Sequence, residues 1–330
     1  MRLTRRQVFR IAASAGATSL TAGWAVGQSA PWPSKPVTLT VGFPPGGLTD
    51  ASARFISGAL GKALGQVVIV ENKPGAASNI AASEVLRSAP DGYRLLVGIS
   101  NLVINPHTFS TPSPDPTKFV PIGVILQSPM VLCVNPALPV KSLAEFLAYV
   151  KKESAAGGFS YASSGAGGVT HLMMELLRDR LQLPKMTHVP YRGSGPALQD
   201  VVGNQVPCIL DATSLTVPFV QAGRLRPLLV TGAKRSAAFP DVPTAMELGY
   251  RDIDYYIWSG LFGPPGLSAE LVVKLNAALN KALSDPAVIG QITKNGDEVG
   301  GGSADRLATL MREQYKVWGD VVKANNIRVE

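Results

Sequence analysis

Two glycine-rich segments of similar sequence have residue types that could hold an anion. The first reads FPPGGLTD at residues 43–50, and the second reads SSGAGGVTH at residues 163–171. Each follows a short apolar run and opens a helical pattern, at 37–43 and 50–64 for the first and at 159–162 and 170–181 for the second. The free N–H groups and positive dipole end of a helix start favour a negatively charged ligand at such a loop. Neither segment has the lysine of a phosphate-binding P-loop, so the pattern favours one small carboxylate, held between two lobes, over a nucleoside triphosphate.

The first loop offers five candidate ligand residues. We expect the backbones of Gly46 and Gly47 to donate to the carboxylate and Phe43 to exclude water, with Thr49 and Asp50 completing the loop. Asp50 is expected to cap the helix and to avoid direct contact with a like charge. The alternative is a plain strand-to-helix turn, in which the glycines only permit positive φ angles.

The second loop offers Ser164, Gly165, Thr170 and His171. The Thr170 hydroxyl could donate to the ligand, and the ring of His171 could face the cleft. The alternative for His171 is a structural residue, whose ring the dipole at the helix start keeps neutral.

Four polar residues elsewhere complete the candidate site. Ser100 ends an apolar run, at the strand end where open α/β sheets bind ligands. Asn79 starts a helical pattern and could bind ligand or cap that helix. Tyr191 belongs to a third polar loop, and Asp211 ends another apolar run, where it could orient donors or meet a cationic part of the solute.

Apolar runs that alternate with amphipathic stretches predict an α/β fold with mostly parallel sheets flanked by helices. Ser142 with Glu145 forms a capping-box pattern at one helix start. Two apolar runs, 120–126 and 131–135, lie on either side of a polar, proline-containing break, and 255–262 is a later aromatic run without a following βαβ unit. We expect these to be strands that cross between two lobes, the first at 31–127 plus 256–330 and the second at 128–255. After residue 266 only helices are expected.

The first 27 residues are expected to be a cleaved export signal. Arg2, Arg5, Arg6 and Arg10 give a basic start, a weakly apolar run follows, and small residues at 25 and 27 suit signal peptidase. The sequence TRRQVF at 4–9 resembles a twin-arginine signal, but a general secretory signal with a chance arginine pair stays open. Loss of this segment removes four arginines and no acidic residue, so the formal charge falls from +8 to +4.

That mildly basic chain has no stripe of cations interleaved with aromatic residues, which argues against nucleic acid as a partner. Cys133 and Cys208 lie in apolar runs, and two buried free thiols are favoured over a disulfide. The histidines are scattered, so no metal site is expected, and no cofactor motif is found.

The whole chain after the export signal resembles the substrate-binding proteins of tripartite tricarboxylate transporters, the Bug family. The matching strings, in order, are PSKPV (33–37), FPPGGLTD (43–50), VENKPGA (70–76), APDGY (89–93), YASSGA (161–166), HVPYRGSGPA (188–197), AGRLRP (222–227), FPDVPT (239–244) and FGPPG (262–266). The resemblance implies a two-lobed type II periplasmic-binding-protein fold that closes on a small carboxylate-bearing solute. It also implies a periplasmic, monomeric protein that delivers this solute to the permease subunits of a membrane transporter.

Two departures from the family pattern leave the identity of the solute open. Ala212-Thr-Ser214 stands where relatives often have asparagine or serine, and Met173-Met174 replaces small residues. A periplasmic sensor that reports to a membrane receptor is an alternative function. A Rossmann-like enzyme is disfavoured, because the loops lack the full dinucleotide fingerprint and no G-x-S-x-G elbow occurs.

Overall fold

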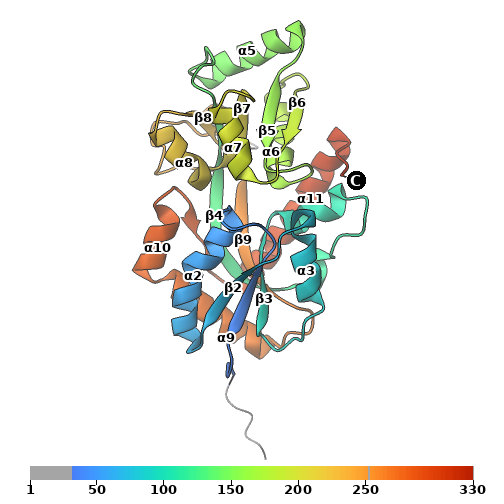
Figure 1. The fold of residues 1–330 in the computed structure, drawn as a ribbon, viewed down its shortest axis with the longest axis vertical. Coiled ribbons are helices and arrows are strands. Elements are labelled where there is room, and N and C mark those ends of the chain that lie inside the picture. The colour runs from blue at the N-terminus through green and yellow to red at the C-terminus, as the bar shows by residue number, and fades with distance from the viewer. Residues whose placement is uncertain (1–31, 252, 330) are drawn as a thin grey trace, which may run out of the picture. The chain divides into compact units, whose positions relative to one another are not determined.

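Three parallel strands organise the first half of the chain in the computed structural model, which describes residues 32–251 and 253–329. β1 (Val37–Val41) lies between β2 (Val68–Asn72) and β3 (Arg94–Ile99). The apolar side chains of β1 and β3 are buried, as expected for strands that helices cover on both faces. The helices that follow these strands are α2 (Leu48–Leu64), α3 (Asn79–Leu86), which comes after the short η1 (Ala76–Ser78), and α4 (Asn101–Thr108) (Figure 1).

A second set of parallel strands repeats this arrangement. β5 (Ser160–Ser163) lies between β6 (Thr187–Pro190) and β7 (Cys208–Ala212). The helices that follow them are α6 (Val169–Arg180), α7 (Ser194–Val202) and α8 (Thr213–Gln221). The orders β2-β1-β3 and β6-β5-β7 correspond, so the two glycine loops follow equivalent strands, β1 and β5.

One long strand, β4 (Val120–Val134), joins the two sets. It pairs antiparallel with β9 (Tyr256–Gly263) up to Pro129, and from Met130 onward with β7 and β8 (Arg226–Val230) (Figure 1). The prediction of two separate runs, 120–126 and 131–135, was therefore wrong. Proline has no N–H for a strand ladder, and Pro129 lies where β4 changes partners, so the strand continues through it.

The register of these strands places the carboxyl ends of both parallel sets close together. Ile99, at the end of β3, pairs with Ser259 of β9, which in turn pairs with Leu126 of β4. Ala212, at the end of β7, pairs with Met130 of β4. Leu126 and Met130 are roughly 13 Å apart along an extended strand at about 3.3 Å per residue. The loops that follow the parallel strands of both sets therefore point toward one region.

The remaining α-helices of the described residues do not follow a parallel strand. They are α5 (Leu143–Ala156), α9 (Ala269–Leu283), α10 (Pro286–Thr293) and α11 (Ala304–Asn325). Ser142 accepts the N–H of Glu145 at 3.2 Å, which confirms the predicted cap, but the Glu145 side chain accepts the N–H of Lys141 and not that of Ser142, so only one half of the capping box forms. The structure also has a one-turn η2 (Pro116–Lys118).

Two elements depart from the sequence prediction. The C-terminal part is not wholly helical, because β10 (Glu298–Val299) pairs antiparallel with β4. Helix α4 was missed, because it contains Pro106 and two asparagines, which are poor helix formers. Its packing against α11 supplies the stability that its sequence lacks.

The two cysteines are free and buried, as expected. They lie on neighbouring strands, with Cys133 opposite Ile209 and Cys208 opposite Val134. Because successive side chains of a strand point to opposite faces, this offset places the two thiols on opposite sides of the sheet.

The chain divides into two units, Met1–Ser34 and Lys35–Glu330, and every element above belongs to the second. The expected export signal at 1–27 lies outside the described residues. Among the helices that the structure describes, none is long and apolar enough to cross a bilayer. The residue ranges given for the two lobes stay a prediction.

A buried glutamine connects the strands to the C-terminal helix. Oε1 of Gln314 accepts the indole N–H groups of Trp258, at 2.7 Å, and Trp318, at 3.1 Å, and both indole side chains are fully buried. Trp258 lies on β9 and Trp318 on α11. Gln314 therefore satisfies two buried donors at the contact between these elements.

We expect Gln314→Leu to lower the free energy of unfolding by about 1–3 kcal/mol for each indole N–H that it leaves without an acceptor. Glu313→Gln, at an exposed position of the same helix, is the control and should stay within about 0.5 kcal/mol of wild type. Chemical denaturation followed by tryptophan fluorescence measures both. Equal stability of the two variants would contradict this role for Gln314.

Candidate ligand-binding site

The helices that follow the parallel strands begin without side-chain caps. In the described residues these are α2, α3, α4, α6, α7 and α8, and no side chain hydrogen bonds to the first turn of any of them from the N-cap position. Gly47 is the N-cap of α2, and Gly168 is the N-cap of α6. The first N–H groups of a helix have no partner within it, so each of these ends offers donors and a positive dipole end.

The helices that do not follow a parallel strand are capped. Ser142, Ser268, Asp285 and Ser303 accept backbone N–H groups at the starts of α5, α9, α10 and α11. The missing caps therefore coincide with the region where the carboxyl ends of the parallel strands meet. That region is suited to an anion, which can accept from several helix starts.

The first glycine loop is held by Asp50, which is not the N-cap that we expected. Asp50 lies inside α2, and its Oδ2 accepts the N–H of Gly46 at 3.0 Å. Nε of Arg54 donates to both carboxylate oxygens at 3.0 Å. Burial alone would raise the pKa of Asp50, but the hydrogen bonds from Arg54, Gly46 and Asn72 outweigh it and lower this pKa. Asp50 is thus an ionised residue whose oxygens face protein donors.

Asn72 is a member of this network that the sequence analysis missed. It ends β2, and its Nδ2 donates to the carbonyl of Phe43 at 3.0 Å and to Oδ1 of Asp50 at 2.9 Å. The side chain therefore fixes both ends of the first loop. The sequence did contain a signal for this role. Asn72 ends the second apolar run, and in a parallel sheet the end of that strand lies next to the end of the first strand, where the first loop begins.

The second glycine loop is held by the Thr170 hydroxyl. Oγ1 of Thr170 accepts the N–H of Ser164 at 2.9 Å and lies 2.8 Å from Oγ of Ser164. Thr170 is 1% exposed. Ser164 and Thr170, both predicted to bind ligand, are therefore brought together, and Thr170 orients the loop from within α6.

His171 packs into the second lobe. Its ring stacks on His188 with centroids 3.7 Å apart, and its Nδ1 accepts the N–H of Gly167 at 3.0 Å. Nε2 of His188 lies 2.6 Å from Oγ of Ser163. Burial lowers the pKa of His171 to about 4 and that of His188 to about 3, so both rings are neutral at pH 7. Burial, and not the helix dipole that we invoked, is the main cause.

Three other candidates use their polar groups within the protein. Asn79 accepts from Nδ2 of Asn105 at 2.7 Å and donates to Ser113. Ser100 accepts the N–H of Trp258 at 3.3 Å. The Tyr191 hydroxyl donates to Asp200 at 2.7 Å, and burial raises its pKa to about 12.

Asp211 differs, because one of its oxygens is unused. Oδ1 accepts the N–H of Ala212 at 2.7 Å, whereas buried Oδ2 has no hydrogen-bond partner among the described residues. Burial raises the pKa of this carboxyl to about 6; the N–H of Ala212 and the nearby Ser194 hydroxyl, which does not reach hydrogen-bond geometry with Oδ2, lower it by smaller amounts. Such a group can accept from a hydroxyl or ammonium of a ligand.

The two sets of strands touch through α4 and the second loop. A Cβ atom added to Gly168 would lie 3.5 Å from Nδ2 of Asn101, the first residue of α4. Asn101 is 5% exposed. In the described part of the chain, no group of three or more His, Cys, Asp or Glu side chains could hold a metal ion.

This fold and this pair of loops define a two-lobed solute-binding protein of the periplasmic-binding-protein type. The model of the family described as tripartite tricarboxylate transporter family receptor matches residues 52–327. The chain belongs to this family. BugT of Bordetella pertussis is 32% identical over 326 residues, which cover 97% of this chain and 99% of BugT.

Solved structures support the same assignment. The chain is similar to the periplasmic binding protein BugD, at 31% identity and a TM-score of 0.81, with 90% of this chain and 100% of that one covered. A Rhodopseudomonas palustris protein solved with adipate gives 32% identity, a TM-score of 0.83 and coverage of 90% and 100%. MatC from Rhodopseudomonas palustris, solved with bound malate, gives 34% identity, a TM-score of 0.77 and coverage of 88% and 99%.

These findings confirm the predicted family and the predicted two-lobed α/β fold. They also confirm the prediction of a binding protein rather than an enzyme, because the family and BugD are described as a receptor and a binding protein. The individual ligand contacts stay predictions.

We expect Thr170→Val to lower the free energy of unfolding by about 1–3 kcal/mol, since the N–H of Ser164 loses its acceptor. Thr170→Ser keeps the hydroxyl and is the matched control. Thermal and urea denaturation of both variants would measure the difference. A valine variant as stable as the serine variant would show that the hydroxyl does not hold the loop.

Asp211 also predicts a pH dependence. Its folded pKa, about 6, is above the ordinary value of 3.8, so its protonated form stabilises the fold and this stability is lost as pH rises from about 4 through 6. Asp211→Asn removes the titration, so the fall in unfolding free energy from pH 4 to pH 7 should shrink by on the order of 3 kcal/mol. Urea denaturation at several pH values measures this slope. Parallel profiles for wild type and variant would contradict the raised pKa.

Proposed function

We propose that this chain is an extracytoplasmic receptor that captures a small carboxylate-bearing solute between its two lobes and delivers it to a tripartite tricarboxylate-type permease. The set of uncapped helix starts at the carboxyl ends of the parallel strands carries the proposal. An anion bound there would accept the first backbone N–H groups of these helices, because no N-cap side chain accepts them.

In each glycine loop, one residue leaves the helix start open for the anion and another holds the loop in shape. Gly47 and Gly168 leave the starts of α2 and α6 open, while Asp50 and Thr170 fix the shapes of their loops from behind. Several charge-assisted hydrogen bonds of roughly 1.5–3 kcal/mol each can exceed the cost of association. A dissociation constant on the order of micromolar or lower is then expected.

The relatives supply the class of solute. The proteins solved with adipate and with malate are dicarboxylate complexes of similar chains. In this chain the unused oxygen of Asp211 could accept from the hydroxyl of a hydroxy acid such as malate. Membership of this family supports the receptor role, the periplasmic location and the permease partner.

Gly47→Val tests the position of the solute. A Cβ atom at Gly47 would meet only the carbonyl oxygen of Pro44, at 4.0 Å, so the larger side chain enters open space and not the core. We expect the variant to melt as wild type does but to bind the solute at least about 100-fold more weakly, because valine occupies the place of the carboxylate. A thermal-shift screen of dicarboxylates followed by calorimetry provides the measurement.

Gly58→Val is the matched control, since Gly58 lies in the same helix, is exposed and has nothing within 4 Å of its Cβ position. It should bind as wild type does. Unchanged affinity in Gly47→Val would remove the first loop from the site, and a wild-type chain that binds no carboxylic acid in the screen would end the proposed function.

A further inference from the structure

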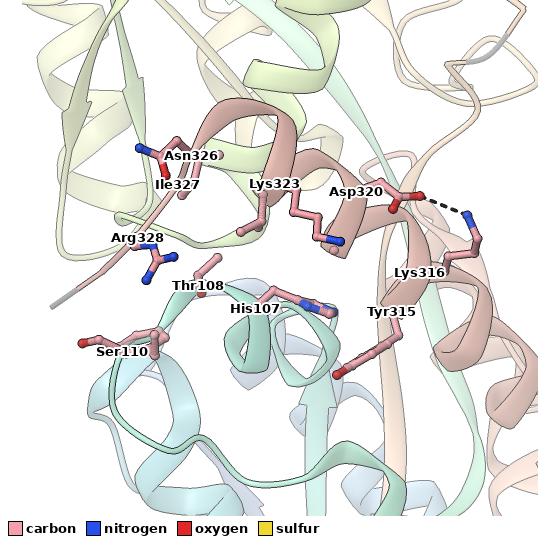
Figure 2. Close-up of a pocket in the computed structure, with 13 residues that line it drawn as sticks. His107, Thr108, Ser110, Tyr315, Lys316, Asp320, Lys323, Asn326, Ile327 and Arg328 are labelled. Atoms are coloured by element: carbon pink, nitrogen blue, oxygen red, sulfur yellow. Dashed lines mark hydrogen bonds and ion pairs between the residues drawn. The ribbon is translucent and has the colours of Figure 1, made fainter.

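A cavity of about 560 Å³ lies between the end of α4 and the end of α11, and neither glycine loop lines it (Figure 2). Its walls come from His107 to Ser110, from the last turns of α11, and from residues 326–328. Small-molecule pockets typically occupy roughly 300–1,000 Å³, so this cavity is large enough for an organic ligand.

Cations dominate the charged groups of this cavity. Figure 2 shows the side chains of Lys323 and Arg328 beside the end of α4. Both are exposed, and neither forms an ion pair with a residue that the structure describes. Lys316 pairs with Asp320 at 3.0 Å in a solvent-exposed salt bridge. The negative charge of Asp320 is therefore balanced by a lysine that also lines the cavity. Lys323 and Arg328 thus leave two positive charges for a ligand.

Part of the remaining wall is apolar and aromatic, beside the polar residues Thr108, Ser110 and Asn326. The ring of Tyr315 lies against that of His107, with centroids 4.1 Å apart, and the tyrosine stays 39% exposed. Val322 and Ile327 add aliphatic surface. Burial lowers the pKa of His107, so its ring is a neutral aromatic surface. An apolar wall beside two cations that pair with no described residue suits a carboxylate that carries an aromatic or aliphatic body.

The same wall supports the second glycine loop. Residues 326–329 form a C-terminal strap that pairs with the end of α4. The N–H of Val329 donates to the carbonyl of Thr108 at 2.7 Å, and the N–H of Ser110 donates to the carbonyl of Val329 at 3.0 Å. A Cβ atom at Gly167 would lie 2.4 Å from Cγ2 of Val329, so the loop rests directly on the strap. Asn325 joins α11 to α6 through Arg178 and Asp179.

We propose that this cavity is a second binding site, that it takes a small carboxylate with an apolar body, and that its occupant steadies the strap against the second glycine loop. The alternative role of Lys323 is to stabilise the last turn of α11, where the helix dipole favours a cation. That role predicts an effect on stability and none on ligand binding.

The probe is 4-bromobenzoate, whose bromine can be located by anomalous scattering. We expect Lys323→Gln/Arg328→Gln to weaken its binding about tenfold or more in calorimetry, because both partners of the carboxylate are lost. Lys151→Gln/Lys152→Gln on α5 removes the same charge at exposed positions outside the cavity and should leave the affinity unchanged.

Every protein in this series carries Gly47→Val, which separates this inference from the proposed function. Bromine at the glycine loops despite that substitution would contradict the expected block by valine and would support carboxylate capture at those loops, whereas an empty cavity would overturn the second site. Bromine in the cavity without measurable affinity in solution would be binding at crystal concentration only and would also overturn it, as would equal affinity of the two double variants.

Hydrogen exchange tests the effect on the loop. With 4-bromobenzoate, the amides of 163–168 and 326–329 should exchange more slowly in the Lys151/Lys152 control protein, and this slowing should be absent from Lys323→Gln/Arg328→Gln. Protection confined to the strap, or present in both proteins, would overturn the proposed link between the cavity and the loop.

Discussion

The site depends on leaving helix starts without side-chain caps. An N-cap side chain is worth about 1 kcal/mol to a helix, and the helices away from the site have one. Those that follow the parallel strands do not, and three of them have glycine at the N-cap: Gly47, Gly168 and Gly193. The fold gives up this contribution in the region where we propose that an anion takes the place of the missing caps.

These helix starts meet only because β4 passes through both sets of strands. Residues before Pro129 pair with β9 and residues after it pair with β7 and β8, so the carboxyl ends of β3 and β7 reach β4 between Leu126 and Met130. A further contact lies at the same place. Oγ of Ser128 donates to the buried carboxyl of Asp297 at 2.6 Å, and burial raises the pKa of Asp297 to about 7. The turn before β10 is thereby tied to the strand that both halves share.

The two glycine loops have similar sequences but are held by different chemistry. Asp50 fixes the first through an ionised carboxylate, with Arg54 and Asn72 as donors. Thr170 fixes the second through a neutral hydroxyl. Because Arg54 offsets the charge of Asp50, neither loop presents an uncompensated negative group toward the region where a carboxylate is expected.

The sequence by itself determined the local elements and the order in which they occur. Apolar runs followed by Gly-Gly and a helical pattern predicted the strands, both loops and the helices after them, and Ser142 with Glu145 predicted a cap that the structure has. These features depend on neighbouring residues, so they can be read from a short window. The strings shared with the family supplied the two-lobed arrangement, which the comparisons confirm.

Only the tertiary structure decided which side chains meet. Asn72 lies 22 residues from Asp50, and His188 lies far along the chain from Ser163, so no local pattern pairs them. The continuity of β4 through Pro129 depends on a change of partner strands, and α4 forms despite Pro106 because α11 packs on it. The stacking of the His171 ring on His188 and the burial of Oδ2 of Asp211 also depend on tertiary structure. Both arise from contacts between segments that are distant in the sequence.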